Sequence, residues 1–314
     1  MKQSKEHPYN FVSAVLYIHN AEERIETFLQ PILDVLEEHF EYAEIICVND
    51  ASEDNSLAVI RQLKNVSEKI SISVIHLSYF HGLEAAMNAG MDFAIGDFVF
   101  EFDNTILDFA KEDILAVYRR ALLGCDIVSA SPVKKEKFTS RLFYRIFDQF
   151  AEVPCQMKTE SFRILSRRAV NRVKSVNNAV LYRKAVYANI GLITDRIYYE
   201  SRQSGMRNAE DKKEKSYRRG LAVDSLLLFT RVGYRFSMMM MFLMMFLSFF
   251  MVAYSLLIYL TKHPIEGWTT TILFLSVVFF GLFGILTLIV KYLQILVNLV
   301  FKRKQYSFET IEKL

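Results

Sequence analysis

Polar residues whose side chains could bind a nucleotide follow three apolar, strand-like runs. His19 and Asn20 come directly after the first run, Asn49 and Asp50 after the second, and Asp103 after a later one. In open α/β sheets, ligands bind outside the carboxyl ends of the strands. The position of these residues therefore predicts a nucleotide site at the strand ends.

The elements that must position these residues alternate between strand and helix patterns. Apolar, strand-like runs occur at residues 11–18, 44–48, 70–77, 98–102 and 126–129. Helical patterns occur between them, at residues 22–40, 55–63, 81–94 and 112–123. Strands that alternate with helices of about 10–15 residues indicate parallel βαβ units. We therefore expect an α/β domain with a doubly wound, mostly parallel sheet.

Composition excludes several classes of protein. Hydrophobic residues make up 52% of the chain and charged residues 23%, and the charged residues are concentrated before residue 236. A net charge of +3 argues against a dedicated nucleic-acid-binding protein. Cys47, Cys125 and Cys155 lack the CxxC spacing of a zinc or dithiol site. The polar start of the chain predicts no cleavable signal peptide.

Two uncharged runs, at residues 237–260 and 269–290, predict two membrane-spanning helices. Each is longer than the roughly 20 residues that cross a bilayer as a helix. Basic residues such as Arg235 and Lys302 flank the pair on its outer sides, so the positive-inside rule places both termini in the cytosol. Residues 216–236 mix apolar residues with arginines, which indicates an amphipathic segment on the bilayer surface or a plain linker.

The order of short motifs along the chain resembles that of the family 2 glycosyltransferases. The matching segments are residues 18–23 (IHNAEE), 49–56 (NDASEDNS), 82–90 (GLEAAMNAG), 96–98 (GDF), 103–105 (DNT), 161–168 (SFRILSRR) and 199–207 (YESRQSGMR). Ahead of two membrane helices, this order is similar to the subgroup that glycosylates polyprenyl phosphate, the dolichyl-phosphate mannose synthase type. The resemblance covers essentially the whole chain. It implies a cytosolic GT-A domain, which is Rossmann-like with a mostly parallel sheet, plus two C-terminal transmembrane helices.

The resemblance also implies an activity and its residues. The expected reaction is an inverting transfer of a sugar from a nucleotide-sugar donor to polyprenyl phosphate, for cell-surface glycan synthesis. Mg²⁺ or Mn²⁺ on Asp103 would stabilise the departing diphosphate. The nucleotide-sugar-binding residues would be His19, Asn20, Glu22, Asn49 and Asp50. The acceptor phosphate would be held by Lys135, Arg163 and Arg167, and the catalytic residues would be Asp103 and Arg163.

Three positions depart from the family motifs. Thr105 replaces the second aspartate of the Asp-x-Asp pair, Asn49 replaces the aspartate expected to contact the base, and Ala21 replaces an acidic residue. Glu101 and Asp108 are near enough in sequence to act as substitute metal ligands. Two hypotheses follow: a working transferase, or a non-catalytic family member that serves as a binding or scaffold partner in a glycan pathway.

The predicted organisation is a GT-A domain at residues 1–215, a juxtamembrane segment at 216–236, transmembrane helices at 237–260 and 269–290, and a cytosolic tail at 291–314. The expected location is the cytoplasmic membrane, as a multi-pass protein in contact with the lipid bilayer. The sequence leaves open whether the chain forms a homo-oligomer.

Overall fold

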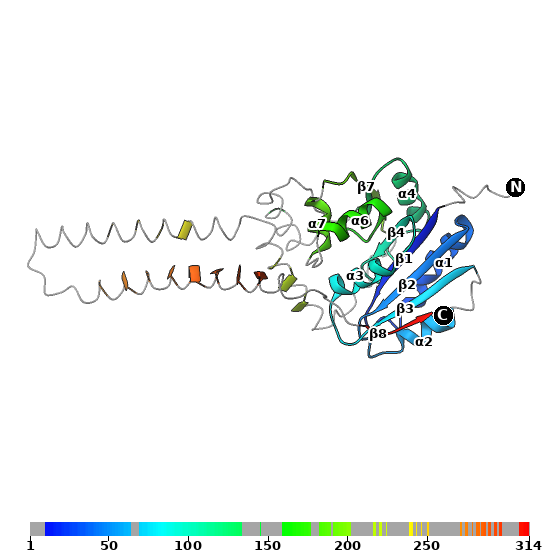
Figure 1. Ribbon diagram of the computed structural model, residues 1–314, viewed down its shortest axis with the longest axis horizontal. Helices are drawn as coiled ribbons and strands as arrows, with labels where there is room; N and C mark the ends of the chain where they lie inside the picture. Colours follow the sequence, from blue (N-terminus) through cyan, green and yellow to red (C-terminus); the bar gives the residue numbers. More distant parts are fainter. Residues whose placement is uncertain are drawn as a thin grey trace, which may run out of the picture.

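The computed structural model describes residues 10–63, 69–133, 159–176, 182–189, 191–201 and 308–313, together with Arg145 and scattered helical residues between 216 and 296. The strands and helices of the described ranges form one domain around a single twisted sheet (Figure 1).

The sheet has eight strands in the order β7-β5-β6-β4-β1-β2-β3-β8. The strands are β1 (Phe11–Ile18), β2 (Tyr42–Asn49), β3 (Ile70–Leu77), β4 (Phe98–Phe102), β5 (Ile127–Pro132), β6 (Phe162–Ser166), β7 (Thr194–Tyr199) and β8 (Phe308–Lys313). The first four run parallel to their neighbours among themselves, whereas β6 is antiparallel to β4 and β5, and β8 is antiparallel to β3. The prediction of an α/β fold with a mostly parallel sheet is therefore confirmed.

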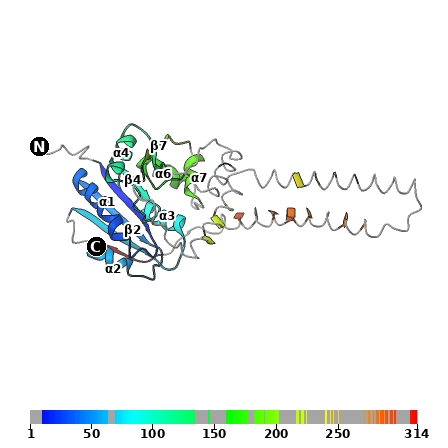
Figure 2. The ribbon, with the colours of Figure 1, turned by 180° about the vertical axis from the view of Figure 1, so that it is seen from behind.

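Helices cover both faces of the sheet (Figure 2). On one face, a buried core includes residues of α1 (Ile25–His39), α2 (Ser56–Leu63) and α4 (Lys111–Leu122). On the other face, a second core includes residues of α3 (Leu83–Phe93), α6 (Arg167–Val176) and α7 (Arg183–Asn189). Successive side chains of a strand point to opposite faces, and β1 accordingly contributes Leu16 to the first core and Val15 and Tyr17 to the second.

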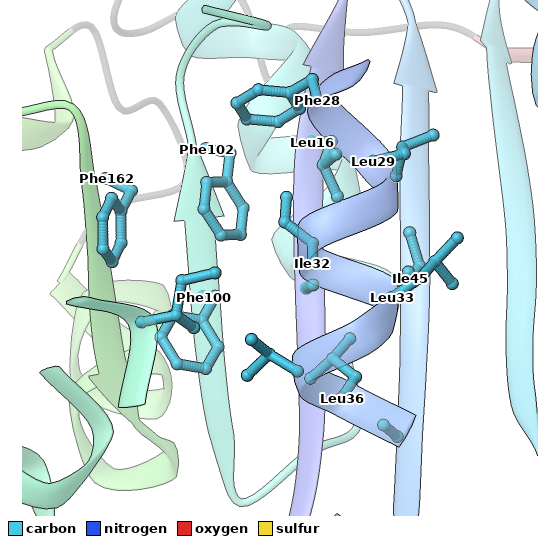
Figure 3. Close-up of a cluster of buried hydrophobic side chains, with 14 of the residues drawn as sticks. Leu16, Phe28, Leu29, Ile32, Leu33, Leu36, Ile45, Phe100, Phe102 and Phe162 are labelled. Atoms are coloured by element: carbon cyan, nitrogen blue, oxygen red, sulfur yellow. The ribbon is translucent and has the colours of Figure 1, made fainter. Parts of the chain in front are cut away.

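The first core fixes the two strands that carry the candidate site, β4 and β6. The apolar face of α1 packs onto the sheet beside a group of aromatic rings (Figure 3). Phe28 of α1 meets Phe102 of β4 edge-on, with ring centroids 5.7 Å apart, and Phe102 stacks on Phe162 of β6 at 5.4 Å. Each such buried side chain contributes about 1.5–3 kcal/mol to stability. The well-packed core therefore fixes the positions of the residues at the ends of β4 and β6.

The predicted strands and helices of residues 11–129 are all found, and the strands at 11–18, 70–77 and 98–102 have the predicted bounds. Strands β6, β7 and β8 were not predicted as strands. The strand β8 lies within residues 291–314, for which only a tail was expected, and it extends the sheet at the edge of β3.

Within the part of the chain that the structure describes, no helix is long and apolar enough to cross a membrane. The predicted spans at residues 237–260 and 269–290 fall largely outside that part. Scattered described residues within them, such as Phe246 and Leu282, are helical and exposed.

Candidate functional site

The strands β4, β1 and β2 bring the predicted nucleotide-binding residues to one end of the sheet. β1 lies between β4 and β2, so the chain adds strands first on one side of β1 and later on the other. Such a switch in strand order is where open α/β sheets bind their ligands. His19 and Asn20 follow β1, Asp50 follows β2, and Asp103 follows β4. The sequence-based placement of these four residues at neighbouring strand ends agrees with the structure.

The loops after β1 and β2 hold each other in place. The backbone N–H of Asn20 donates to Ser52 Oγ at 3.1 Å, and the carboxylate of Glu22 accepts hydrogen bonds from the backbone and side chain of Asn55 at 3.1 and 3.0 Å. Asn49 Oδ1 accepts from the backbone N–H of Ser52 at 3.2 Å. Asn20 has a φ of 47°, a left-handed conformation that Asn tolerates better than most residues. Glu22 and Asn49, predicted to bind the nucleotide, therefore stabilise the loops in this structure.

Asp50 is fully buried and fixes the start of α3. Its two carboxylate oxygens accept the backbone N–H groups of His81 and Gly82, each at 2.8 Å, and the hydroxyl of Tyr17 donates to it at 3.2 Å. His19 Nδ1 lies 2.7 Å from the carbonyl oxygen of Asp50, which favours the tautomer with its proton on Nδ1. The Asp50 carboxylate thus positions the loop before α3.

Asp103 is clamped between two buried arginines. Its Oδ2 accepts a hydrogen bond from Arg163 at 2.5 Å, and its Oδ1 accepts one from Arg183 at 2.6 Å. Both arginine side chains are 1% exposed, against 13% for Asp103. The predicted catalytic pair, Asp103 and Arg163, is therefore in direct contact, and Arg163 is largely shielded from an acceptor.

A second carboxylate, Glu101, continues the ion network below Asp103. Arg163 donates to its Oε2 at 3.1 Å, Tyr187 donates to its Oε1 at 2.7 Å, and Arg183 Nη1 lies 2.9 Å from the same Oε1. Arg183 also donates to Glu84 of α3 at 2.8 Å. Buried charges are stable only when they are paired and hydrogen-bonded. The network therefore ties α3, β4, β6 and α7 together at the candidate site.

Burial and neighbouring charges act in opposite directions on the pKa of Asp103. Burial favours the neutral acid, but the attraction of Arg163, Arg183 and Lys184 outweighs burial and lowers the pKa of Asp103 well below its ordinary value. Asp103 is therefore ionised throughout the physiological pH range. Burial, with the charge of Glu101 added, raises the pKa of Tyr187 well above its ordinary value, so Tyr187 stays neutral and remains a hydrogen-bond donor.

The outer edge of the network carries two partly exposed cations beside Glu160. Lys184 Nζ and Arg196 Nη2 lie 3.9 and 3.6 Å from the carboxylate oxygens of Glu160, and their side chains are 17% and 20% exposed. Glu160 itself lies 3.3 Å from Arg163 Nε. We refer to Lys184 and Arg196 as the rim cations.

Arg167 lies at the opposite end of the sheet from Asp103. β6 is antiparallel to β4, and Arg163 pairs with Glu101 near the end of β4. Ser166 pairs with Phe98, the first residue of β4, and Arg167 comes directly after Ser166. Its guanidinium donates to the carbonyl groups of Ala94 and Gly96. The structure does not bring Arg163 and Arg167 together, so their positions do not support one acceptor-phosphate site. Lys135, predicted for the same site, lies outside the described residues.

Sequence reasoning missed Arg183, Tyr187 and Glu160. Arg183 and Tyr187 lie in α7, a short helix whose sequence has no clear apolar periodicity. Glu84 could have been noticed as an acidic residue in the otherwise small and apolar start of α3. The partners of Arg183, Tyr187 and Glu84 are distant in sequence, so spacing alone could not reveal these three residues. Glu160 lies only three residues before its partner Arg163.

The profile of glycosyl transferase family 2 matches residues 13–174, which is more than half of the chain. The chain belongs to glycosyl transferase family 2. This match includes the ends of β1, β2 and β4 and most of the ion network.

Curated members of the family are similar over different lengths. An uncharacterized glycosyltransferase of Synechocystis is 30% identical over 57% of this chain and 58% of its own length. A bactoprenol glucosyl transferase of Shigella phage SfV is 27% identical over 60% of this chain and 62% of its own. The matched region thus spans about three fifths of these two relatives. The uncharacterized glycosyltransferase YkcC of Bacillus subtilis is 25% identical over 83% of this chain and 81% of its own.

Solved structures of sugar transferases share the fold. Mannosyl-3-phosphoglycerate synthase of Rubrobacter xylanophilus aligns with a TM-score of 0.50 at 16% identity, over 69% of this chain and 74% of its own. Glucosyl-3-phosphoglycerate synthase of Mycobacterium tuberculosis, in complex with Mn²⁺, UDP-glucose and phosphoglyceric acid, aligns with a TM-score of 0.52 at 14% identity, over 70% and 79%. At such identities the likeness shows the fold, a GT-A fold, and no more.

The side chains of this family 2 member fit a divalent metal poorly at Asp103. Mg²⁺ and Mn²⁺ prefer several hard oxygen ligands, carboxylates above all. Both oxygens of Asp103 accept from arginine, Glu101 is fully buried, and Asp108 accepts from the hydroxyl of Tyr199 at 2.8 Å. Among the residues described, no group of three or more His, Cys, Asp or Glu side chains is arranged to hold a metal. The predicted metal ligand Asp103 and the substitutes Glu101 and Asp108 are all engaged elsewhere.

Proposed function

We propose that this chain is a membrane-bound, inverting glycosyltransferase that moves a sugar from a nucleotide-sugar donor to polyprenyl phosphate. The observation that carries the proposal is the position of Asp103, His19 and Asp50 at the switch in strand order of a family 2 domain. The named activity of the bactoprenol glucosyl transferases supports a polyprenyl phosphate as the acceptor.

The proposed reaction is a single displacement at the anomeric carbon of the donor sugar. An oxygen of the acceptor phosphate forms the new bond to that carbon, the bond to the donor diphosphate breaks, and the nucleoside diphosphate leaves with the electron pair. The acceptor phosphate is already anionic, so it needs no strong base. The protein would act by orienting the two substrates and by neutralising charge.

Two features support a place at the cytosolic face of a membrane. The runs at 237–260 and 269–290 contain no charged residue, and several of the described large apolar side chains within them, such as Leu243 and Leu286, are about half exposed. Extended apolar exposure of this kind favours burial in lipid. In addition, β8, which follows the two runs, pairs with β3, which precedes them. Two membrane crossings would return the chain to the side on which it started, as this pairing requires.

A second candidate is a non-catalytic family member that binds a lipid-linked glycan or a partner enzyme. The observations in its favour are the engagement of both Asp103 oxygens by arginine and the presence of Thr105 in place of the second aspartate. These two candidates differ in whether a sugar is transferred.

The test is an assay of the purified full-length chain in detergent or lipid nanodiscs. The reaction contains polyprenyl phosphate and one of a panel of labelled UDP-, GDP- and other nucleotide sugars, first with both Mg²⁺ and Mn²⁺ and then with EDTA. Formation of a sugar-phosphate lipid with one donor, reduced at least a hundredfold by Asp103→Asn, is expected. The anomeric configuration of the product, compared with that of the donor, tests inversion. If no donor yields product while a bactoprenol glucosyl transferase is active in parallel, the second candidate is favoured.

A further inference from the structure

The carboxylates nearest to the expected diphosphate site already have cations of the protein as partners. Asp103 receives one arginine on each oxygen, and Glu101 has Arg163 on one oxygen and Arg183 with Tyr187 on the other. A divalent metal at Asp103 would have to displace at least one guanidinium and would then lie beside the charge of both. Thr105, at the position of the second aspartate of the family motif, is neutral and buried, so it offers the metal no further negative charge.

The rim cations are differently placed. They are the partly exposed cations of the network, whereas Arg163 and Arg183 are 1% exposed. Both lie farther from Glu160 than a hydrogen bond allows, at 3.9 and 3.6 Å, and Arg196 also donates from Nε to Ser129 Oγ at 3.4 Å, which leaves Nη2 beside Glu160. Lys184 is also close enough to Asp103 to contribute to the low pKa of that carboxylate. Among the described residues, Lys184 and Arg196 are therefore the cations of the network best placed to meet a phosphate from solvent.

We propose that the rim cations Lys184 and Arg196 bind the diphosphate of the nucleotide donor, and that this binding requires no divalent metal. The inference rests on the proposed function and deepens it. Lys184 and Arg196 would exchange their distant ion pairs with Glu160 for contacts to the phosphate, while Arg163 and Arg183 keep Asp103 ionised and in place. When the sugar leaves, the electron pair of the broken bond stays on the diphosphate, and the rim cations neutralise the charge that develops there.

Titration calorimetry on the full-length chain in detergent tests the inference. UDP, GDP, CDP and dTDP are each titrated in EDTA and again in Mn²⁺. One nucleoside diphosphate is expected to bind with a Kd that changes by no more than about twofold between the two conditions. Lys184→Gln should weaken that binding about tenfold in both conditions, since a hydrogen bond to a charged group is lost. Arg196→Gln should also weaken it.

The control variant is Lys174→Gln. Lys174 is likewise an ion-paired lysine, 3.1 Å from Asp92, but it lies on α6 and pairs near the end of α3, whereas the ion network contacts Glu84 near the start of α3. Its replacement should leave the Kd unchanged. Rim variants that bind like wild type would overturn the assignment of Lys184 and Arg196. Binding seen only with Mn²⁺ would overturn metal-free binding and leave the transferase proposal standing. Binding of no nucleotide in either condition, by folded protein, would overturn both.

Discussion

Replacement of Arg183 by glutamine tests whether the ion network holds the candidate site together. The side chain of Arg183 is 1% exposed and lies within 3 Å of oxygens of Glu84, Glu101 and Asp103. Glutamine keeps part of the volume and some hydrogen-bonding capacity but removes the charge. Breaking a buried ion pair from one side costs about 3–5 kcal/mol, because the remaining charge stays buried without compensation.

This cost should be visible as a fall in the melting temperature of the full-length chain. For a domain of about 150–250 residues, 1 kcal/mol corresponds to about 2–4 °C, so Arg183→Gln should lower Tm by roughly 6–20 °C. Near-ultraviolet circular dichroism follows the loss of tertiary packing around the aromatic core. The matched control is Arg120→Gln. Arg120 is also paired to an aspartate, Asp195, but is 50% exposed, and an exposed pair contributes about 0–1 kcal/mol.

The pH dependence of the same measurement adds a second check. Asp103 has a lowered pKa in the folded protein, so its ionised form stabilises the fold above the unfolded pKa of about 3.9 and this stabilisation is lost as the pH falls through the folded pKa. The difference between wild type and Arg183→Gln should therefore shrink as the pH falls below about 4. Equal and small losses for Arg183→Gln and Arg120→Gln at pH 7 would refute the reasoning.

Three further predictions concern other parts of the fold. In thermal unfolding, Gly82→Ala should lower the free energy of unfolding by about 2–4 kcal/mol, because Gly82 has a φ of 87° and an added Cβ would overlap the ring of Tyr217. The control is Gly124→Ala, at a φ of 96° with open space around it, which should lower the free energy of unfolding by only about 1–2 kcal/mol. Deletion of residues 308–314 should speed hydrogen exchange in β3, which pairs with β8, and leave exchange in β4 unchanged. Burial raises the pKa of Cys47 to about 12, so iodoacetamide at pH 8 should label Cys47 only after unfolding, as peptide mass spectrometry would show. Labelling of Cys47 in the folded protein would contradict its burial.

The parallel half of the sheet was predictable because its signals are local. Each of β1 to β4 is an apolar run followed by a helix with its own periodicity, and the strand ends coincide with polar motifs. The strands β6 and β7 gave no comparable signal. β6 is the five-residue segment FRILS, with an arginine at its second position. That arginine can be buried because it pairs with Glu101 of β4 and with Asp103, directly after β4. Its place in the sheet depends on tertiary partners.

The residues of the candidate site were predicted better than their roles. Asp103 and Arg163 were both selected, and they do meet, but as partners of one another. Sequence motifs identify which residues lie at a strand end, yet they do not show which neighbours have taken their hydrogen bonds. Glu22 illustrates this point, since its carboxylate is occupied by Asn55.

The pairing of β8 with β3 has a consequence for how the protein is made. On the ribosome, β3 is synthesised early, and its outer edge stays unpaired until almost all of the intervening chain has been translated. An unpaired edge is a template for strand addition by other chains, so the nascent domain is exposed to misassembly throughout that interval. Joining segments so distant in sequence also requires the closure of a very long loop, although the entropic cost of closure grows only slowly with loop length. The sheet can therefore be completed only after synthesis has reached β8 and after β3 and β8 lie in the same compartment.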